Sequence, residues 1–435
     1  MSALPVAAAD RSKGQAPNRL LSRKTLLLVL GACQFVWGAP ATWAMGDIKQ
    51  LTHLYKLAET HPSVGFARSQ SEIVRNELDA IEWGRYPSLS VNGAQPFDSA
   101  STLTFTVEQP LYTAGRQEAL TEAGRSRLIA SEHRTKQAIL DIQKEVAAAY
   151  VEMLRAQRRV TDAEANIREL ERLFGVIERR VNAEVSARAE QVLAKARLQQ
   201  AISDRYQYLG DLHAAQNRLR SATGIDVSRV NPLVCQPNKA LLETELVEQA
   251  YRRAPQLARL AAERAVFEEE VKVAQAERFP RIVLGAEHAS RLNLFEDADL
   301  RGYVGLQYQL QDGLSVNSRI AAAQAQVLSV DEDERLAREN IRQEIAEWLR
   351  SYRAASNQIS PLSALVESNE GLIESYLRQY QAGKKSWLDV INAQREMIQA
   401  RFLLTDSFAT QCASAVALDL ITGSNLSKEQ GVLIE

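Results

Sequence analysis

Apolar or small side chains recur at alternating spacings of three and four residues through the middle of the chain. Between residues 139 and 181 every position of this pattern carries such a side chain: Ile139, Ile142, Val146, Ala149, Met153, Ala156, Val160, Ala163, Ile167, Leu170, Phe174, Ile177 and Val181. Only a 3.5-residue period keeps one seam facing a neighbour over this length, so we expect an underwound, supercoiled helix. It should run from about 116 to 182, or roughly 100 Å at 1.5 Å per residue.

The same pattern occurs a second time, shifted by 199 residues. Arg338 and Asn369 interrupt this second seam, whose other positions are again apolar or small: Ile341, Ile345, Trp348, Tyr352, Ala355, Ile359, Leu362, Val366, Ile373, Tyr376 and Tyr380. Near the start of each half, a shift of 193 relates two short motifs, Arg85, Tyr86, Pro87 and Arg278, Phe279, Pro280. The chain is therefore expected to contain two repeats, 45–240 and 241–435.

Alternation of apolar and polar residues predicts one strand hairpin in each repeat. In the first repeat, a strand around Leu89 and Val91 is followed by a loop, Gly93 to Ser99, and by a second strand over Ser101–Val107. In the second repeat, the loop is expected to run from Arg291 to Arg301 and to absorb six additional residues. Its strands are expected to contain Ile282, Leu284, Ala286, Val304, Leu306, Tyr308 and Leu310.

Each repeat should thus contain a short helix, a strand hairpin, a long helix, a turn and a return helix. Four strands cannot close a barrel by themselves. An open strand edge in lipid would leave backbone groups unpaired at several kcal/mol each. If these strands meet a membrane, several chains must share one barrel.

The turns between the long helices carry helix-end signals. In the second repeat, Gly383 suits a left-handed C-terminal cap, and Ser386 with Asp389 resembles a capping box at the next helix start. The equivalent turn of the first repeat, from Asn182 to Glu190, has no glycine. Its shape is therefore left open.

The first residues resemble a secretory signal peptide. Five basic residues precede an apolar run from Thr25 to Trp37, and small residues follow. Cleavage after Ala41 or Ala44 would remove a segment of about 44 residues. A lipoprotein-type box ending at Cys33 is the alternative. Because residues 1–44 contain five basic residues and one acid, their removal changes the formal charge from −2 to −6, which argues against a nucleic-acid partner.

Composition places the protein in the mainly α class. The chain is 46% hydrophobic and contains only 12 prolines. Two cysteines, Cys235 and Cys412, remain after processing, and they either form one disulfide or stay unpaired. The histidines are scattered, and neither a phosphate-binding glycine loop nor a nucleophile motif is present. We therefore expect no enzymatic activity, no cofactor and no metal site.

The chain resembles the TolC family of bacterial outer-membrane channel-tunnels, because the same features occur in the same order in both of its repeats. The resemblance rests on the twofold repeat, the hairpins, the tips and the segment that opens the long helix, with Pro110, Leu111, Tyr112 and Gly115. It implies a homotrimer whose twelve strands form a small transmembrane β-barrel, continued across the periplasm by an antiparallel coiled-coil helical barrel. The implied location is the outer membrane, in contact with its lipid.

The resemblance also implies roles for the tips. Asp389 matches the first of two aspartates that line a periplasmic iris in the family, whereas Asn392 stands where the second would be; Glu190 is the first-repeat counterpart. Three Asp389 side chains would form an acidic gating ring, although a simple capping role is the alternative. A periplasmic adaptor would dock on the tip residues Asn182, Ala183, Glu184, Val185, Gly383, Lys384, Lys385 and Ser386.

The run from Lys385 to Val390 is similar to the branch that serves type I secretion of large adhesins. The expected function is therefore the exit duct of such a system, connected through the adaptor to an inner-membrane ABC transporter. An outer-membrane component of a multidrug efflux pump is the first alternative. A periplasmic coiled-coil adaptor or structural protein is the second. An adaptor would have one helical hairpin flanked by β-rich domains, and a structural coiled coil would have no use for the strand hairpins.

Overall fold

The computed structural model describes five stretches of the chain, namely residues 48–95, 102–235, 242–291, 299–308 and 310–423. The predicted signal peptide and Cys33 lie outside them. All described elements belong to one unit, Ala44–Glu435.

The two halves have the same order of elements. The first half contains α1 (Ile48–Ala58), α2 (Pro62–Trp83), β1 (Ser88–Ala94), β2 (Thr102–Tyr112), α3 (Arg116–Asn182) and α4 (Arg188–Thr223). The second half contains α5 (Glu243–Arg253), α6 (Pro255–Ala276), β3 (Arg281–Arg291), β4 (Asp299–Gln307), α7 (Leu310–Gln381) and α8 (Trp387–Thr422). The predicted long helix over 116–182 is thereby confirmed at both ends.

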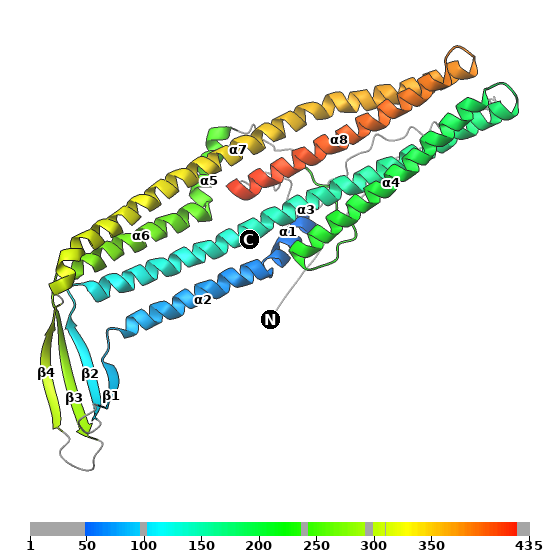
Figure 1. Ribbon diagram of the computed structural model, residues 1–435. Coiled ribbons are helices and arrows are strands. Elements are labelled where there is room, and N and C mark those ends of the chain that lie inside the picture. Colours follow the sequence, from blue (N-terminus) through cyan, green and yellow to red (C-terminus); the bar gives the residue numbers. More distant parts are fainter. Residues whose placement is uncertain (1–47, 96–101, 236–241, 292–298, 309, 424–435) are drawn as a thin grey trace, which may run out of the picture. The chain divides into compact units, whose positions relative to one another are not determined.

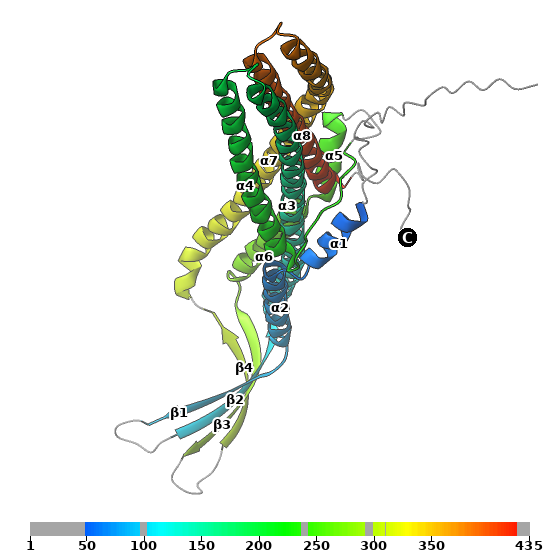
Figure 2. The same ribbon diagram turned by 90° about the vertical axis from the view of Figure 1, so that its right-hand side faces the viewer.

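The short helices pack along the long ones. Helix α3 begins after Gly115, whose φ of 80° is left-handed and therefore suits glycine. Helix α2 contacts the part of α3 near the sheet and α4 contacts the part near the tip, while α8 lies between α3 and α7. Figures 1 and 2 show both helix turns, α3–α4 and α7–α8, at the end remote from the strands. The seam residues Ile142, Val146, Met153 and Ile177 are buried, as the 3.5-residue period predicts.

The strands form one antiparallel sheet in the order β1-β2-β3-β4, so the pairing of β2 with β3 joins the two halves. The predicted bounds of the second loop were wrong. The six additional residues of the second half lengthen strands β3 and β4 instead. Strand β3 ends at Arg291, four residues after the equivalent of the end of β1, and β4 begins two residues before the equivalent of the start of β2. Tyr308 and Leu310 lie beyond β4. Gly93, expected in a loop, pairs with Leu103 inside the sheet.

The largest core cluster draws on both halves. Tyr150 and Met153 of α3 pack there with Cys412 of α8 and Tyr352 of α7. Cys412 is bonded to Cys235, which lies in the connector after α4, across a sequence separation of 177. Of the two states that the sequence left open for these cysteines, the structure therefore has the disulfide.

Candidate functional site at the helix tips and the sheet

The second tip is organised by a complete capping box. The Ser386 backbone N–H and hydroxyl donate to Asp389 Oδ2 at 3.0 and 2.8 Å, and the Asp389 backbone N–H donates back to Ser386 Oγ at 3.3 Å. Lys385 Nζ lies 3.9 Å from Asp389 Oδ1 and 4.5 Å from the centroid of the Tyr376 ring. The hydrogen bonds from Ser386, assisted by Lys385, hold the pKa of Asp389 below its usual value. Asp389 therefore keeps its negative charge in mildly acidic solution.

The first tip has the same backbone shape without the glycine. Glu184 takes a φ of 58°, where Gly383 of the second tip takes 72°. In the first tip the Val185 N–H donates to Arg180 O at 2.9 Å, and in the second the Lys384 N–H donates to Gln379 O at 2.9 Å. The missing glycine therefore leaves the backbone shape of the turn unaltered. It changes only the conformational free energy of forming that turn.

Contacts between side chains connect the two tips. The Tyr380 hydroxyl donates to Glu190 Oε2 at 2.9 Å and lies 2.8 Å from Ser186 Oγ. Arg180 Nε donates to Ser186 Oγ at 3.1 Å, and another guanidinium nitrogen of Arg180 donates to the Gln381 carbonyl at 3.3 Å. The Arg180 guanidinium also lies 4.8 Å from the centroid of the Tyr380 ring. This set of four side chains and one carbonyl, the tip bridge, links the end of α7 to the start of α4.

An apolar cluster of buried side chains packs against the tip bridge. Trp387 is 1% exposed and packs with Ile177, Val390 and Ile391 from α3 and α8. Its ring lies 5.4 Å from that of Tyr380, centroid to centroid. The tip bridge is therefore packed against a buried apolar cluster.

The candidate residues proposed from the sequence separate into three groups. Glu190 belongs to the tip bridge, Asp389 is held on its own helix by Ser386, and Asn392 lies one turn further along α8 and is half-buried. Seven of the eight proposed docking residues are exposed, and the eighth, Lys385, is half-buried. Sequence reasoning missed Arg180, Tyr380 and Trp387 as site residues. Tyr380 was noticed as a seam position, and a tyrosine that ends a heptad seam beside a turn was the available signal.

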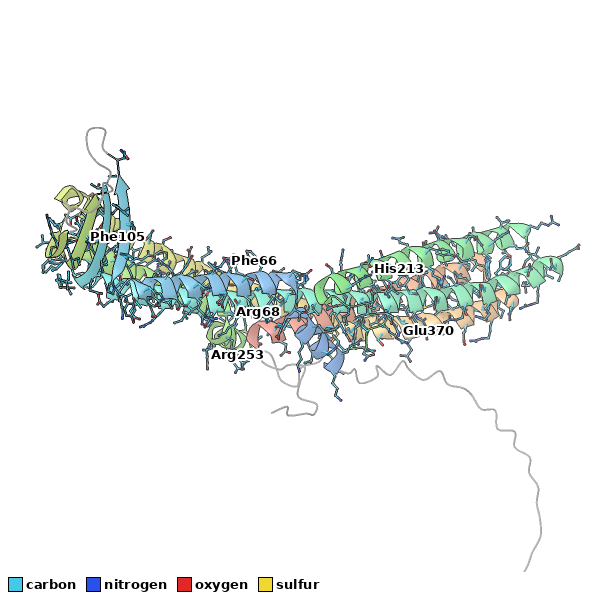
Figure 3. The ribbon with its side chains drawn as sticks, turned by 90° about the horizontal axis from the view of Figure 1, so that it is seen from below. Phe66, Arg68, Phe105, His213, Arg253 and Glu370 are labelled. Atoms are coloured by element: carbon cyan, nitrogen blue, oxygen red, sulfur yellow. A yellow bond between two sulfur atoms is a disulfide. The ribbon has the colours of Figure 1, made fainter. Side chains whose placement is uncertain are left out.

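The sheet at the other end has two chemically different faces. Cross-strand pairs such as Leu89 with Val107 and Leu284 with Val304 form an apolar face, and these four side chains are 66%, 40%, 47% and 69% exposed. Phe105, labelled in Figure 3, lies on this face opposite Val91.

The opposite face is polar. Thr106 and Arg301 both pair with Glu287 there. The Tyr303 hydroxyl donates to Glu108 Oε1 at 2.7 Å while its ring crosses Gly285, where a Cβ would lie 2.2 Å from Tyr303 Cζ. A side chain at 285 would therefore displace the Tyr303 ring from this position. A sheet with an exposed apolar face and a polar opposite face suits a boundary between lipid and water.

Other kinds of site are not evident in the described stretches. No helix there combines the length and apolar character needed to cross a bilayer. No group of three or more His, Cys, Asp or Glu side chains in those stretches could hold a metal ion.

Solved structures of other proteins share this fold, and three of them illustrate the similarity. A membrane protein from Pseudomonas aeruginosa is 22% identical, with a TM-score of 0.76 over 86% of this chain and 92% of its own. The outer membrane protein VceC from Vibrio cholerae is 18% identical, with a TM-score of 0.74 over 86% and 96%. The Neisseria gonorrhoeae MtrE outer membrane channel, solved in its open state, is 18% identical, with a TM-score of 0.73 over 88% and 91%.

Comparison of the sequence itself gives the family. No curated protein sequence matches the chain. The family model described as outer membrane efflux protein matches residues 55–225 and 246–424, one stretch for each half. Because these two stretches cover most of the chain, the protein belongs to the outer membrane efflux protein family, as its resemblance to the TolC family predicted.

Proposed function

We propose that three copies of this chain form an outer-membrane channel that serves as the exit duct of a type I secretion system for large adhesins. The observation that carries the channel is the sheet, with its exposed apolar face, its polar face and its two outer strands, β1 and β4. Open strand edges are not tolerated in lipid, so neighbouring copies must pair with β1 and β4. Four strands from each of three chains make an even-numbered, twelve-stranded barrel.

The helices extend this channel away from the membrane. Helix α3 has 67 residues and α7 has 72, which correspond to about 100 Å each at 1.5 Å per residue. A duct of that length bridges much of the periplasm. The two tips then lie at the periplasmic entrance, opposite the barrel.

We infer that the entrance is gated at these tips. The tip bridge holds the two helix hairpins of one chain together, and its hydrogen bonds must break before the hairpins can separate. Asp389 of three chains would form an acidic ring and Asn392 a neutral polar ring one turn further in. A ring of negative charge in a constriction favours cations.

The exposed tip residues are the proposed docking surface for a periplasmic adaptor. They comprise Asn182, Ala183, Glu184 and Val185 of the first tip with Gly383, Lys384, Lys385 and Ser386 of the second. Lys384 is exposed, whereas Lys385 is held by Asp389 and the Tyr376 ring, so Lys384 is the cation better placed to meet a partner. The adaptor would connect the channel to an inner-membrane ABC transporter.

Multidrug efflux is the second candidate, and the description of the matching family as efflux proteins favours it. The two candidates differ in cargo. Deleting the gene should abolish surface display of a large adhesin if the channel serves type I secretion. It should instead lower the inhibitory concentrations of several unrelated drugs if the channel serves efflux.

The channel itself is tested by native and denaturing mass spectrometry of protein extracted from outer membranes with detergent. We expect a trimer whose chains begin near Thr42 or Met45. A chain that begins at a lipidated Cys33 would leave the channel proposal intact. It would show that cleavage occurs before Cys33 and not after Ala41 or Ala44. A monomer in the soluble periplasmic fraction would contradict the proposal.

A further inference from the structure

The helices of the two halves correspond at fixed sequence offsets. Adding 199 to the bounds of α4 gives the bounds of α8, and adding 193 to the bounds of α2 gives those of α6. Helices α3 and α7 end at Asn182 and Gln381, which are again 199 positions apart. Each contact that α3 makes therefore defines an equivalent position on α7.

Helix α7 lacks two neighbours that its equivalent α3 has. Helix α3 packs along α2, α4, α6 and α8. Within the described stretches, and apart from the short helix α5, α7 packs along only α6 and α8, the equivalents of α2 and α4. It meets α4 of its own chain only at the tip bridge. The missing neighbours correspond to α6 and α8 on α3, so on α7 they are α2 and α4 of another copy.

The sheet leads to the same partner. Pairing of β2 with β3 places α3, which follows β2, beside α6, which precedes β3. In the proposed barrel, β4 of one copy pairs with β1 of the next. Because α7 follows β4 and α2 precedes β1, the same antiparallel pairing places α7 beside α2 of the next copy. The junctions of α3 with α6 and α8 thus predict the residues that meet between copies.

Near the sheet, this rule assigns a cover to an exposed apolar residue. Val266 of α6 is 5% exposed, one turn from Glu263, which pairs with Arg134 of α3 at 3.5 Å. The equivalent of Val266 on α2 is Ile73, which is 49% exposed. Packing of α2 on α7 of another copy would bury Ile73 as Val266 is buried inside the chain.

The same register brings two larger exposed side chains together. Glu263 and Arg134 correspond to Gln70 of α2 and Asp333 of α7. One turn away from this pair, Phe66 of α2 comes beside Leu336 of α7. These side chains are 67% and 59% exposed in the single chain, and Phe66 is labelled in Figure 3. Contact between them would remove both from water.

At mid-length, the rule brings Tyr206 to Pro361. Inside the chain, the Thr405 hydroxyl of α8 donates to Asp162 Oδ2 of α3 at 3.1 Å. Subtracting 199 from 405 gives Tyr206 of α4, and adding 199 to 162 gives Pro361 of α7. Tyr206 is 66% exposed and Pro361 is exposed as well. The two residues that replace a buried pair are therefore both on the surface of the single chain.

Pro361 offers an apolar ring and an acceptor. Its nitrogen carries no hydrogen, so the carbonyl of Asn357, four residues earlier, lacks the helix bond that residue 361 would donate. A carbonyl that becomes buried without a donor costs free energy. A tyrosine suits such a position because its ring is apolar and its hydroxyl donates.

We propose that Tyr206 of one copy packs on Pro361 of the next, with its ring against the proline ring and its hydroxyl donating to the Asn357 carbonyl. The inference rests on the proposed trimer and adds a specific contact between its protomers. The chemistry inside the chain is retained between copies. In both junctions a hydroxyl on a return helix, Thr405 or Tyr206, donates to an acceptor on a long helix.

The residues around this contact are compatible with a second copy as the partner. Inside the chain, the bond between Thr405 and Asp162 is flanked by contacts that join Arg159 to Asp406 and Asn166 to Gln394. Their equivalents between copies are Gln358 with Gln207 and Leu365 with Lys195. All four are exposed in the single chain, and neither pair brings like charges together.

The contact is tested by photochemical cross-linking. Tyr206 is replaced in the full chain by the photoreactive p-benzoylphenylalanine, and the protein is extracted from outer membranes with detergent and irradiated. We expect covalent dimers and trimers on denaturing electrophoresis, with the link mapped by mass spectrometry to within one helical turn of Pro361. The same replacement at Tyr208 is the matched control. The Tyr208 ring lies 5.1 Å from that of Phe402 in the same chain, so this probe should link within the chain.

Two results would overturn the contact while leaving the channel intact. One is the absence of a link between chains in a preparation that native mass spectrometry shows to be trimeric. The other is a link from position 206 to its own chain or to a residue remote from Pro361. A preparation that is monomeric by native mass spectrometry would contradict the proposed channel itself, so the two failures are distinguishable.

The hydrogen bond is tested by the rate at which trimers dissociate on heating in detergent. Tyr206→Phe keeps the ring and loses the hydroxyl, so its trimers should dissociate about threefold faster than those of the wild type. In a Pro361→Ala background, residue 361 itself donates to Asn357, and Tyr206→Phe should then have no effect. Equal rates for the wild type and Tyr206→Phe would overturn the hydrogen bond. An equal effect of Tyr206→Phe in both backgrounds would overturn the Asn357 carbonyl as its acceptor.

Discussion

The hydroxyl of Tyr380 donates a hydrogen bond to the Glu190 carboxylate at 2.9 Å, although the two residues are 190 positions apart. Tyr380 lies in the last turn of α7 and Glu190 in the first turn of α4. The bond therefore joins the two helix hairpins of one chain at the proposed entrance. Under the gating proposal, the strength of this bond sets how easily the entrance opens.

Tyr380→Phe should make the channel easier to open. The variant loses the hydrogen bonds to Glu190 and Ser186 but keeps the ring that packs on Trp387, at a cost of about 1 kcal/mol. We expect higher conductance in planar bilayers. Tyr376→Phe is the matched control, because the contact of Tyr376 with Lys385 involves only the ring. Equal conductance of the two variants would remove the tip bridge from the gating proposal.

Glu184→Gly should stabilise the protein. Glu184 has a φ of 58°, a conformation that costs a non-glycine residue roughly 1–2 kcal/mol. Part of this gain is offset by the larger backbone entropy of glycine in the unfolded chain, which leaves a net gain of about 0.5–1 kcal/mol. Thermal unfolding followed by circular dichroism measures it. Gly383→Ala is the converse control and should destabilise; a loss of stability in both variants would contradict the account of the turn.

The proposed acidic ring should retain its charge in acid. Ser386 lowers the pKa of Asp389, so the ionised form persists as pH falls through the usual range of an aspartate and is lost only below it. Cation preference measured in planar bilayers should follow the same course. Ser386→Ala should move the loss of preference to higher pH, and Asp389→Asn should abolish the pH dependence. If the cation preference survived in Asp389→Asn, Asp389 would have no role in selectivity and would only cap its helix.

Asp162→Asn should stabilise the protein at neutral pH. Asp162 is 4% exposed between α3 and α8, and burial raises its pKa although Arg158, the Thr405 hydroxyl and Arg401 oppose the shift. A raised carboxyl pKa gives stability that is full below the unfolded pKa and is lost as pH rises through the folded pKa.

The difference between wild type and Asp162→Asn should therefore be about 1 kcal/mol at pH near 7.5 and should shrink in acid. Unfolding curves at several pH values measure it. Asp406→Asn is the control and should lower the stability of the protein, because Asp406 accepts two short hydrogen bonds from Arg159 at 2.6 and 2.8 Å. A destabilised Asp162→Asn at neutral pH would mean that its ion pair outweighs its burial.

Removing the disulfide should destabilise the middle of the molecule. The bond between Cys235 and Cys412 closes a loop across 177 residues, which in the chain-entropy account is worth about 3–5 kcal/mol. Cys235→Ala, Cys412→Ala and the double variant should unfold alike, because each breaks the same bond. A double variant much less stable than either single variant would show that packing of the buried sulfurs dominates.

The heptad seam and the offset of 199 residues determined the helices from sequence alone, because a helix period is local and its repetition over many turns leaves one solution. The predicted bounds of α3 coincide with those observed. The hairpins were also predictable, but not the strand ends: periodicity does not say whether additional residues lengthen a loop or its strands. Only pairing across the sheet, as in Gly93 with Leu103, decides that.

The site depended more on tertiary structure. The sequence identified the capping role of Ser386 and Asp389 and the second turn, since glycine, serine and acidic residues at helix ends have local causes, whereas Glu190 was named only through the resemblance to the family. It did not identify Tyr380 as the partner of Glu190, or Cys235 as bonded to Cys412. These contacts join segments far apart in the chain, and they exist only because α8 packs against α3 and brings the two hairpins together.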